Sequence, residues 1–171
     1  MAYSAIAVAN SFIEKSKLRD ISDLSPMKLQ KLVYFAHAWM LALTDKPLIN
    51  EPVKAWQYGP VINSVYHEFK NFGSQNITNL GTEFEGIDSD NIFDMKYVIP
   101  RIPKDDNQSN QIIDAVLDTY GNKSATFLSN LTHEPGSAWC ETQHEHNKGH
   151  ARGYVIDNEI IKKSMKSKLG V

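Results

Sequence analysis

The stretch Leu24-Ser-Pro-Met-Lys-Leu-Gln-Lys-Leu-Val-Tyr-Phe-Ala-His-Ala-Trp-Met-Leu-Ala-Leu43 decides the fold, because it predicts one long helix that is apolar on nearly all sides. Ser25 is a favourable N-cap, and Pro26 at the first helical position loses no hydrogen bond, since the N–H there has no partner within a helix. A helix that is apolar all round belongs in the centre of a core. We therefore expect a central buried helix over about residues 25–44. Only its first turn is expected to face solvent, with Lys28, Gln30 and Lys31.

Further helices are predicted on both sides of the central one, from apolar residues that recur at helical spacing and from residue types that favour helix ends. Gly59 and Pro60 are expected to open one of them, because proline is favoured in the first turn of a helix. The last predicted helix is basic and begins after Asp157. By residue range, the predicted helices cover about 4–15, 59–73, 108–120, 124–131, a turn after Ser137, and 157–168.

Two segments suit short strands. Residues 53–58 and residues 92–99 are rich in β-branched and aromatic residues, and prolines follow the second segment. The expected fold class is therefore α+β and predominantly helical. It is a single compact domain over residues 1–171, with its core at about 5–160, the central buried helix and a small β element from these two segments.

Length and composition bound the class of protein. The 171 residues suit one domain that buries its own core, and a net charge of −2 argues against nucleic acid as a partner. Cys140 is the only cysteine, so no internal disulfide is expected. The first helix has no basic leader, and the longest apolar run is too short for a bilayer. We expect a cytoplasmic protein with no membrane partner and no cofactor.

Histidines near the C-terminal end of the sequence suggest a metal site. His144, His146 and His150 stand close together beside a glutamate, and imidazoles at this spacing suit a shared metal ion. The alternative is a polar loop over about residues 141–150 whose histidines face water. The loop is favoured, because the neighbouring residues offer no rigid frame for a metal.

Two other histidines, His133 and His37, are candidates for chemical or structural roles. His133 beside Glu134 suits a general acid–base pair, which would make the protein a small hydrolase, but no nucleophile or phosphate loop accompanies the pair. We favour the structural alternative, in which His133 ends a helix and Trp139 fills the core. His37 lies on the apolar central helix and is expected to be a hydrogen-bonded core residue. No catalytic residue and no metal are expected.

Trp56, Tyr58 and Tyr66 surround the Gly59-Pro60 break. Tyrosine and tryptophan bury much area while keeping a polar group, so they fill cores and also dominate protein interfaces. Trp56 and Tyr58 are expected to brace the turn on one side and to leave polar edges for a partner on the other. Tyr66 is expected on the buried face of its helix.

Several segments together resemble one family. Residues 25–36 have the pattern S-x-x-K-L-Q-K-L-x-Y-x-A, residues 51–61 have E-x-x-x-A-W-x-Y-G-P-V, and residues 128–133 have L-S-x-L-T-H, followed by Trp139. These motifs, in this order, resemble the Panacea family, which includes the SocA-like antitoxins and the phage-associated GepA proteins. The match extends over most of residues 5–160. The histidines at 144–150 are outside the pattern, and the terminal helix lacks an aromatic residue expected near its end.

The resemblance implies an antitoxin of a toxin–antitoxin system. Such a protein binds a cognate protein toxin, expected to be encoded by an adjacent gene, or acts as a proteolytic adaptor that delivers the toxin to a protease. An oligomer with the toxin is a further alternative, and DNA binding through the basic residues 162–168 is a minor one. We expect partner-binding roles for Lys28, Lys31, Trp56 and Tyr58. We expect structural roles for Ser25, Pro26, Gly59, Pro60, Tyr66, His133 and Trp139.

Overall fold

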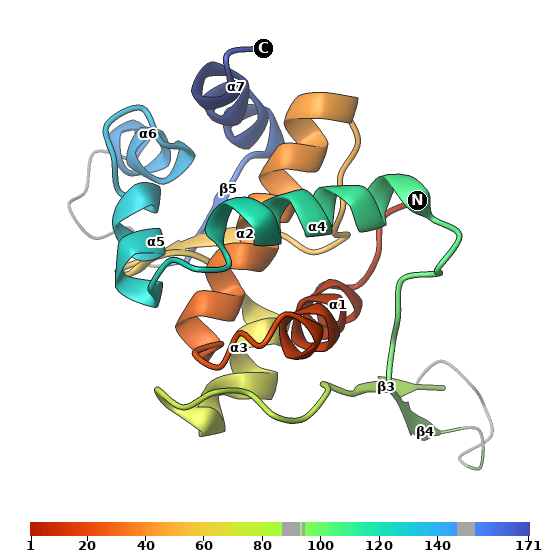
Figure 1. Ribbon diagram of the computed structural model, residues 1–171. Helices are drawn as coiled ribbons and strands as arrows, with labels where there is room; N and C mark the ends of the chain where they lie inside the picture. The colour runs from red at the N-terminus through yellow and green to blue at the C-terminus, as the bar shows by residue number, and fades with distance from the viewer. Residues whose placement is uncertain (87–92, 94, 147–152) are drawn as a thin grey trace.

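Helix α2 (Pro26–Thr44) runs through the middle of the molecule (Figure 1). The computed structural model describes residues 1–86, 93, 95–146 and 153–171. Ser25 caps α2, its side chain accepting a hydrogen bond from the Lys28 backbone N–H, and Pro26 occupies the first turn. From Lys28 to Ala42 all residues except the half-buried Trp39 are buried. The predicted central buried helix is therefore confirmed.

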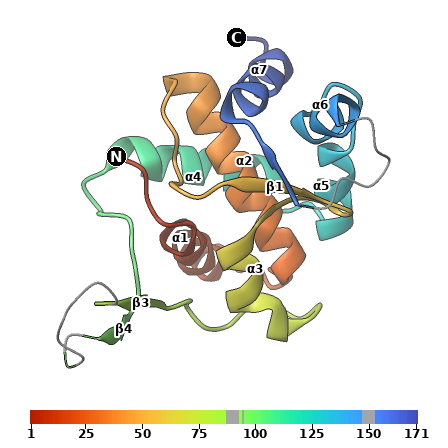
Figure 2. The ribbon, with the colours of Figure 1, turned by 180° about the vertical axis from the view of Figure 1, so that it is seen from behind.

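Helices from both halves of the chain surround α2. Its neighbours are α1 (Ala5–Leu18), α3 (Asn63–Phe69), α4 (Asn107–Tyr120), α5 (Ala125–Thr132) and α7 (Asn158–Leu169). Figures 1 and 2 show them on different sides of the orange α2 ribbon. The predicted helices at 4–15, 108–120, 124–131 and 157–168 are confirmed, and the model has the predominantly helical α+β fold that the sequence predicts.

His37 connects three segments inside the core: α2, residues 48–49 and the start of α7. Its side chain is fully buried, its Nδ1 accepts the backbone N–H groups of Leu48 and Ile49 at 3.3 Å each, and its Nε2 lies 3.0 Å from Asn158 Oδ1. Because Nδ1 accepts, Nε2 carries the proton and donates it to Asn158. Burial lowers the pKa of His37, which favours this neutral form. The predicted hydrogen-bonded core histidine is confirmed.

A three-stranded antiparallel sheet lies beside the N-terminal half of α2. β1 (Val53–Trp56) is the middle strand, with β2 (Gly59–Ile62) on one side and β5 (Tyr154–Ile156) on the other. The predicted strand at 53–58 is confirmed over β1. The prediction that Gly59 and Pro60 open a helix is wrong, because both belong to β2 and α3 begins at Asn63. β2 is an edge strand, where the missing N–H of Pro60 removes no ladder hydrogen bond.

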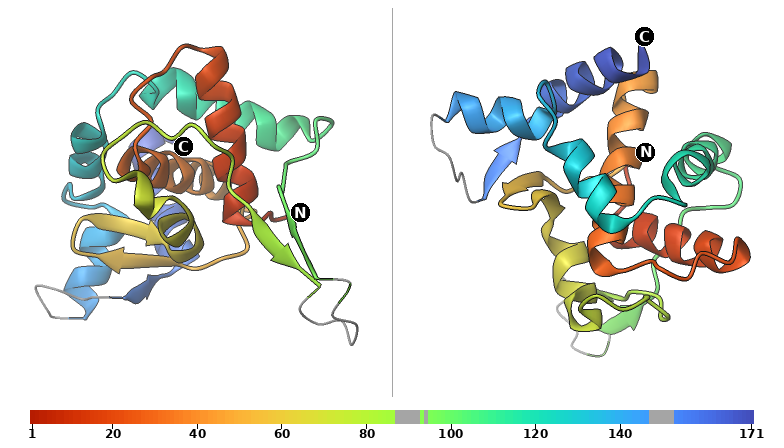
Figure 3. Two further views of the ribbon diagram at one scale, coloured as in Figure 1. Left: turned by 90° about the horizontal axis from the view of Figure 1, so that it is seen from below. Right: turned by 60° about the vertical axis from the view of Figure 1, so that its left-hand side comes forward.

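A separate two-stranded ribbon stands apart from the helices. β3 (Glu83–Glu85) pairs with β4 (Lys96–Val98), and Figures 1 and 3 show the pair projecting away from α2. The strand predicted at 92–99 is confirmed over 96–98, while positions 92 and 94 lie outside the described residues. The expectation of one β element is wrong, because β1 and β4 belong to different sheets.

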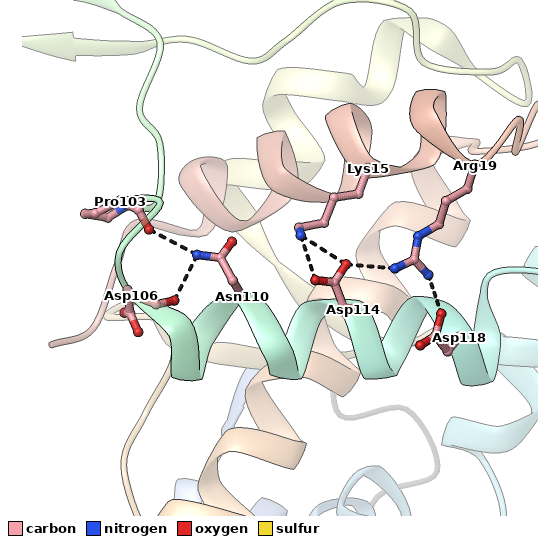
Figure 4. Close-up of polar contacts among 7 residues, drawn as sticks. All are labelled: Lys15, Arg19, Pro103, Asp106, Asn110, Asp114 and Asp118. Carbon is pink, nitrogen blue, oxygen red and sulfur yellow. Dashed lines mark hydrogen bonds and ion pairs between the residues drawn. The ribbon is translucent and has the colours of Figure 1, made fainter.

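Ion pairs fix α4 against α1 (Figure 4). Asp114 on α4 accepts from Lys15 Nζ at 2.8 Å and from Arg19 at 2.8 Å, and Arg19 also contacts Asp118 at 2.5 Å. At the start of α4, Asn110 Nδ2 donates to the backbone oxygen of Pro103 at 3.0 Å. These groups are partly exposed, so they orient the two helices more than they stabilise them.

The C-terminal region contains more helix than the sequence predicts. Ser137 caps α6 (Ala138–Glu145), as expected, but the helix continues through residues predicted to form a loop. The extension follows from burial, because Ala138 and Thr142, one helical turn apart, both face inward. The short 3-10 helix η1 (Lys70–Phe72) completes the described elements. Within the described ranges, no helix has the length and hydrophobicity needed to traverse a lipid bilayer.

Candidate partner-binding pocket

An open pocket of about 790 Å³ lies between the start of α2, the β1–β2 hairpin and α3. Three aromatic side chains line it, from Trp56, Tyr58 and Tyr66. Three lysines line it as well, Lys31 from α2, Lys54 from β1 and Lys70 from η1, and no aspartate or glutamate is among its described lining residues. The pocket is therefore aromatic and positively charged.

The aromatic part of the pocket lining includes a ring contact between Trp56 and Tyr66. Their ring centroids are 4.9 Å apart at 61°, an edge-to-face arrangement. Tyr58, in the turn of the hairpin, is 66% exposed. The expected burial of Tyr66 is wrong, since its side chain is exposed and the buried face of α3 consists of Val65 and Phe69. Tyr66 still supports the hairpin through its contact with Trp56.

Lys31 lines the pocket from α2, and its Nζ lies beside Gly59 and Pro60 of the hairpin. Only 2% of it is exposed, and among the described residues its Nζ has one acceptor, the backbone oxygen of Pro60 at 3.2 Å. Burial lowers the pKa of Lys31 to about 7. The expectation that Lys31 faces solvent is therefore wrong, because the β1–β2 hairpin covers the first turn of α2.

Gln30 attaches the hairpin to α2. Its Nε2 donates to the Ile62 backbone oxygen at 2.9 Å, and its Oε1 accepts the Ile62 N–H at 3.1 Å. The amide thus takes the place of a neighbouring strand at the open edge of β2. The expected exposure of Gln30 is wrong for the same reason as that of Lys31.

Lys28 is buried outside the pocket, and its expected exposure is also wrong. The side chain is 0% exposed, its Nζ lies 2.6 Å from Asp23 Oδ1, and it donates to the Gly121 backbone oxygen at 2.7 Å. Lys28 and Lys31 are thus both buried on one helix, but only Lys28 has a carboxylate partner among the described residues.

His133 and Trp139 support the hairpin from α5 and α6. The His133 ring lies between two backbone oxygens, with Nδ1 2.7 Å from Ser129 and Nε2 3.2 Å from Gln57, and it contacts the Trp139 ring at 4.2 Å. Trp139 Nε1 donates to the Trp56 backbone oxygen at 2.7 Å. The structure is consistent with the structural roles predicted for both residues, and His133 follows the last turn of α5 as expected.

His133 and Glu134 do not contact each other in the way that a general acid–base pair requires. The Glu134 carboxylate pairs with Lys168 Nζ at 3.2 Å, while the two ring nitrogens of His133 contact backbone oxygens. The neighbouring Cys140 is a free thiol whose Sγ donates to the His133 backbone oxygen at 3.1 Å. The acid–base pair considered from the sequence is therefore absent from this part of the described structure.

The histidines considered as metal ligands do not form a metal site in the described structure. His144 lies in the last turn of α6, and His146 follows that helix and stacks on Tyr154 with ring centroids 3.9 Å apart. His150 lies outside the described residues. Among the residues that the structure describes, no group of three histidine, cysteine, aspartate or glutamate side chains is placed to hold a metal ion.

Glycine permits the close approach of the hairpin to α5. Gly59 has φ +106°, and a Cβ at this position would lie 2.6 Å from Thr132 Oγ1 and 2.9 Å from Lys31 Nζ. The local sequence around Gly59 does not predict this contact, because it depends on how three distant segments meet. The predicted structural role of Gly59 thus has a steric reason, although the predicted helix start does not exist.

Comparison with known proteins identifies the family to which this chain belongs. The model of the family described as "Antitoxin SocA-like, Panacea domain" matches residues 29–140, which include Lys31, the hairpin and Trp139. The chain is similar to a protein named Antitoxin SocA from Caulobacter vibrioides (strain NA1000 / CB15N), at 32% identity over 158 residues, covering 92% of this chain and 80% of that protein. No solved structure matches the chain. The protein therefore belongs to the SocA-like antitoxin family that is defined by the Panacea domain.

Proposed function

We propose that this protein neutralises a cognate protein toxin by binding it directly, with the pocket and its rim as the centre of the interface. Family membership supports the antitoxin role. The observation that supports the location is the pocket itself, which presents Trp56, Tyr58 and Tyr66 at a surface of the molecule. Tyrosine and tryptophan in a pocket are the side chains that most often dominate binding energy.

Rigidity of the hairpin supports the same location. The hairpin is held by β5, by the Gln30 amide and by Trp139, so its aromatic residues are positioned before a partner arrives. Preorganised side chains lose little conformational entropy on binding, which raises affinity. A stable interface buries roughly 1,200–2,000 Å² in total, so the toxin would also contact surfaces around the pocket.

Growth rescue tests the proposal. The adjacent gene is placed under an inducible promoter and co-expressed with the wild-type chain, with Tyr58→Ala or with Tyr97→Ala. Tyr58 and Tyr97 are both well exposed, at 66% and 76%, but Tyr97 lies on the β3–β4 ribbon away from the pocket. We expect the wild type and Tyr97→Ala to restore growth, and Tyr58→Ala to bind the toxin at least about tenfold more weakly.

Two outcomes would contradict the proposal. One is a toxic neighbouring gene that the wild-type chain leaves fully active, and the other is equal loss of binding for both tyrosine variants. Toxin abundance, measured by immunoblot in cells with and without their ATP-dependent proteases, separates direct neutralisation from delivery to a protease. Direct neutralisation predicts intact toxin in a stable complex, whereas an adaptor lowers toxin abundance only where the protease is present.

A further inference from the structure

We propose that the pocket receives an acidic segment of the partner protein, with one side-chain carboxylate bound to the Lys31 ammonium. This inference rests on the proposed function, because it specifies the chemistry of the surface that the toxin presents. It follows from the charges that line the pocket, from the missing counter-charge of Lys31 and from the aromatic groups beside it.

The pocket is positive although the protein as a whole is slightly acidic. The chain carries 18 Lys and Arg against 20 Asp and Glu, yet Lys31, Lys54 and Lys70 line the pocket without a described carboxylate. No ion pair is found for the three pocket lysines among the described residues, as is also true of several lysines outside the pocket, such as Lys46. Of the two buried lysines, however, Lys28 has a carboxylate partner, and none is described for Lys31. The excess of positive charge is therefore local, and it complements an anionic partner.

Lys31 gives the strongest indication of where a carboxylate binds. An ammonium has three N–H donors, but the described structure supplies one acceptor, the Pro60 backbone oxygen. A buried charge without a partner is strongly unfavourable. Lys28, one turn earlier on the same helix, shows how the protein satisfies a buried lysine internally, through Asp23 and a backbone oxygen. A carboxylate from the partner would give Lys31 the equivalent contact.

The surroundings favour an acidic peptide over other anions. Trp56, Tyr58 and Tyr66 provide apolar area for the residues beside the carboxylate. The three lysines come from three different elements, which suits several carboxylates along a segment better than one isolated group. The phosphates of nucleic acids are bound mainly by accessible cations along an extended backbone, whereas Lys31 is only 2% exposed.

Protonation of Lys31 should couple this binding to pH. Burial lowers its pKa to about 7, so the free protein loses the ammonium as pH rises above that value, and the affinity for a carboxylate should fall. The other titratable side chains facing this region are Lys54, Lys70, Tyr58 and Tyr66, which line the pocket, and His133. The His133 Cε1 lies 3.3 Å from the position of a Cβ at Gly59. Comparing the pH dependence of binding in the wild type and in a Lys31 variant separates the contribution of Lys31 from that of the other groups.

Peptide titration of the full chain tests the inference without any toxin. The probes are two acetylated and amidated peptides, Gly-Glu-Phe-Glu-Leu-Gly and Gly-Gln-Phe-Gln-Leu-Gly, added to the isotope-labelled protein and followed by NMR. We expect the acidic peptide to bind at least about tenfold more tightly than its amide counterpart and to shift the Trp56 indole resonance. Lys31→Met should abolish this preference, and Lys46→Met, at an exposed lysine outside the pocket, should retain it.

Each failure has a distinct meaning. Equal binding of the two peptides, no binding at millimolar concentration, or a preference that survives Lys31→Met would overturn the inference. Tighter, steeply salt-dependent binding of a single-stranded oligonucleotide would also overturn it. Growth rescue is measured separately: if wild type and Lys31→Met neutralise the toxin equally, this inference fails and the proposed function stands. If the wild type does not neutralise the toxin, the proposed function fails whatever the peptides do.

Discussion

Replacing Lys31 by methionine should stabilise the protein, because the substitution removes a buried amine that has no described counter-charge and keeps a side chain of similar length. Lys31 is 2% exposed, and burial lowers its pKa from 10.5 to about 7. At about 1.4 kcal/mol for each pH unit, this difference corresponds to a cost on the order of 5 kcal/mol when Lys31 is charged. The cost should disappear in Lys31→Met, so the free energy of unfolding should rise.

The pH dependence of this gain has a definite sign. Unfolded Lys31 keeps its proton up to about pH 10.5, whereas folded Lys31 loses it near pH 7. Between these values the unfolded chain binds more protons, so wild-type stability rises with pH. The advantage of Lys31→Met is therefore largest below pH 7 and decreases as pH increases through this window.

Urea denaturation of both proteins from about pH 6 to about pH 9 measures the difference. Lys28→Met is the matched control, since it removes a buried lysine from the same helix that does have partners, Asp23 and the Gly121 backbone oxygen. It should lower the free energy of unfolding by roughly 1–3 kcal/mol, the opposite sign. If Lys31→Met is also destabilising near pH 7, or if its advantage does not change with pH, the reasoning about a buried amine without a counter-charge is refuted.

Three further predictions concern the groups that hold the core and the hairpin. Because burial lowers the pKa of His37, the unfolded chain takes up a proton first, so wild-type stability should fall as pH drops below about 6.5. The difference in unfolding free energy between wild type and His37→Gln, followed by urea titration toward acid pH, should show this loss, and a constant difference would contradict it. Gly59→Ala should lose about 2–4 kcal/mol, because its Cβ would collide with a hydroxyl 2.6 Å away on α5. Gly136→Ala, at φ +81° with nothing within 4 Å, should lose only about 1 kcal/mol, and equal losses in thermal unfolding would exclude the steric explanation. Trp139→Phe should cost about 1–2 kcal/mol, since the Trp56 backbone oxygen loses its donor at 2.7 Å, and unchanged chemical denaturation would show that water replaces it.

Local signals predict the helices well. Ser25, Ser124, Ser137 and Asp157 cap α2, α5, α6 and α7, because capping depends on a few consecutive residues that the sequence shows directly. The apolar stripe of α4 is equally local, and its five residues are all buried: Ile112, Ile113, Val116, Leu117 and Tyr120. These elements could be located without knowledge of their neighbours.

Contacts between distant segments explain what the sequence did not predict. Gly59-Pro60 suits a helix start as well as an edge strand, and only pairing with β1 decides between them. Lys28 and Lys31 resemble surface residues until segments far along the chain cover them. The pocket could be anticipated in part, because the sequence shows Trp56 and Tyr58 beside the Gly59-Pro60 break and both line it, but its charged interior depends on the burial of Lys31.

The central place of β1 in its sheet affects the order in which the chain can fold during translation. One of its edges stays open until residues 154–156 have been made, and His37 lacks its Asn158 acceptor until the same moment. A nascent chain that ends at residue 146 therefore has a β1 strand paired only with β2 and a side of α2 that α7 does not yet cover. The sheet beside the pocket is thus completed only by a segment synthesised much later, and an open strand edge of this kind is prone to aggregation until that segment arrives.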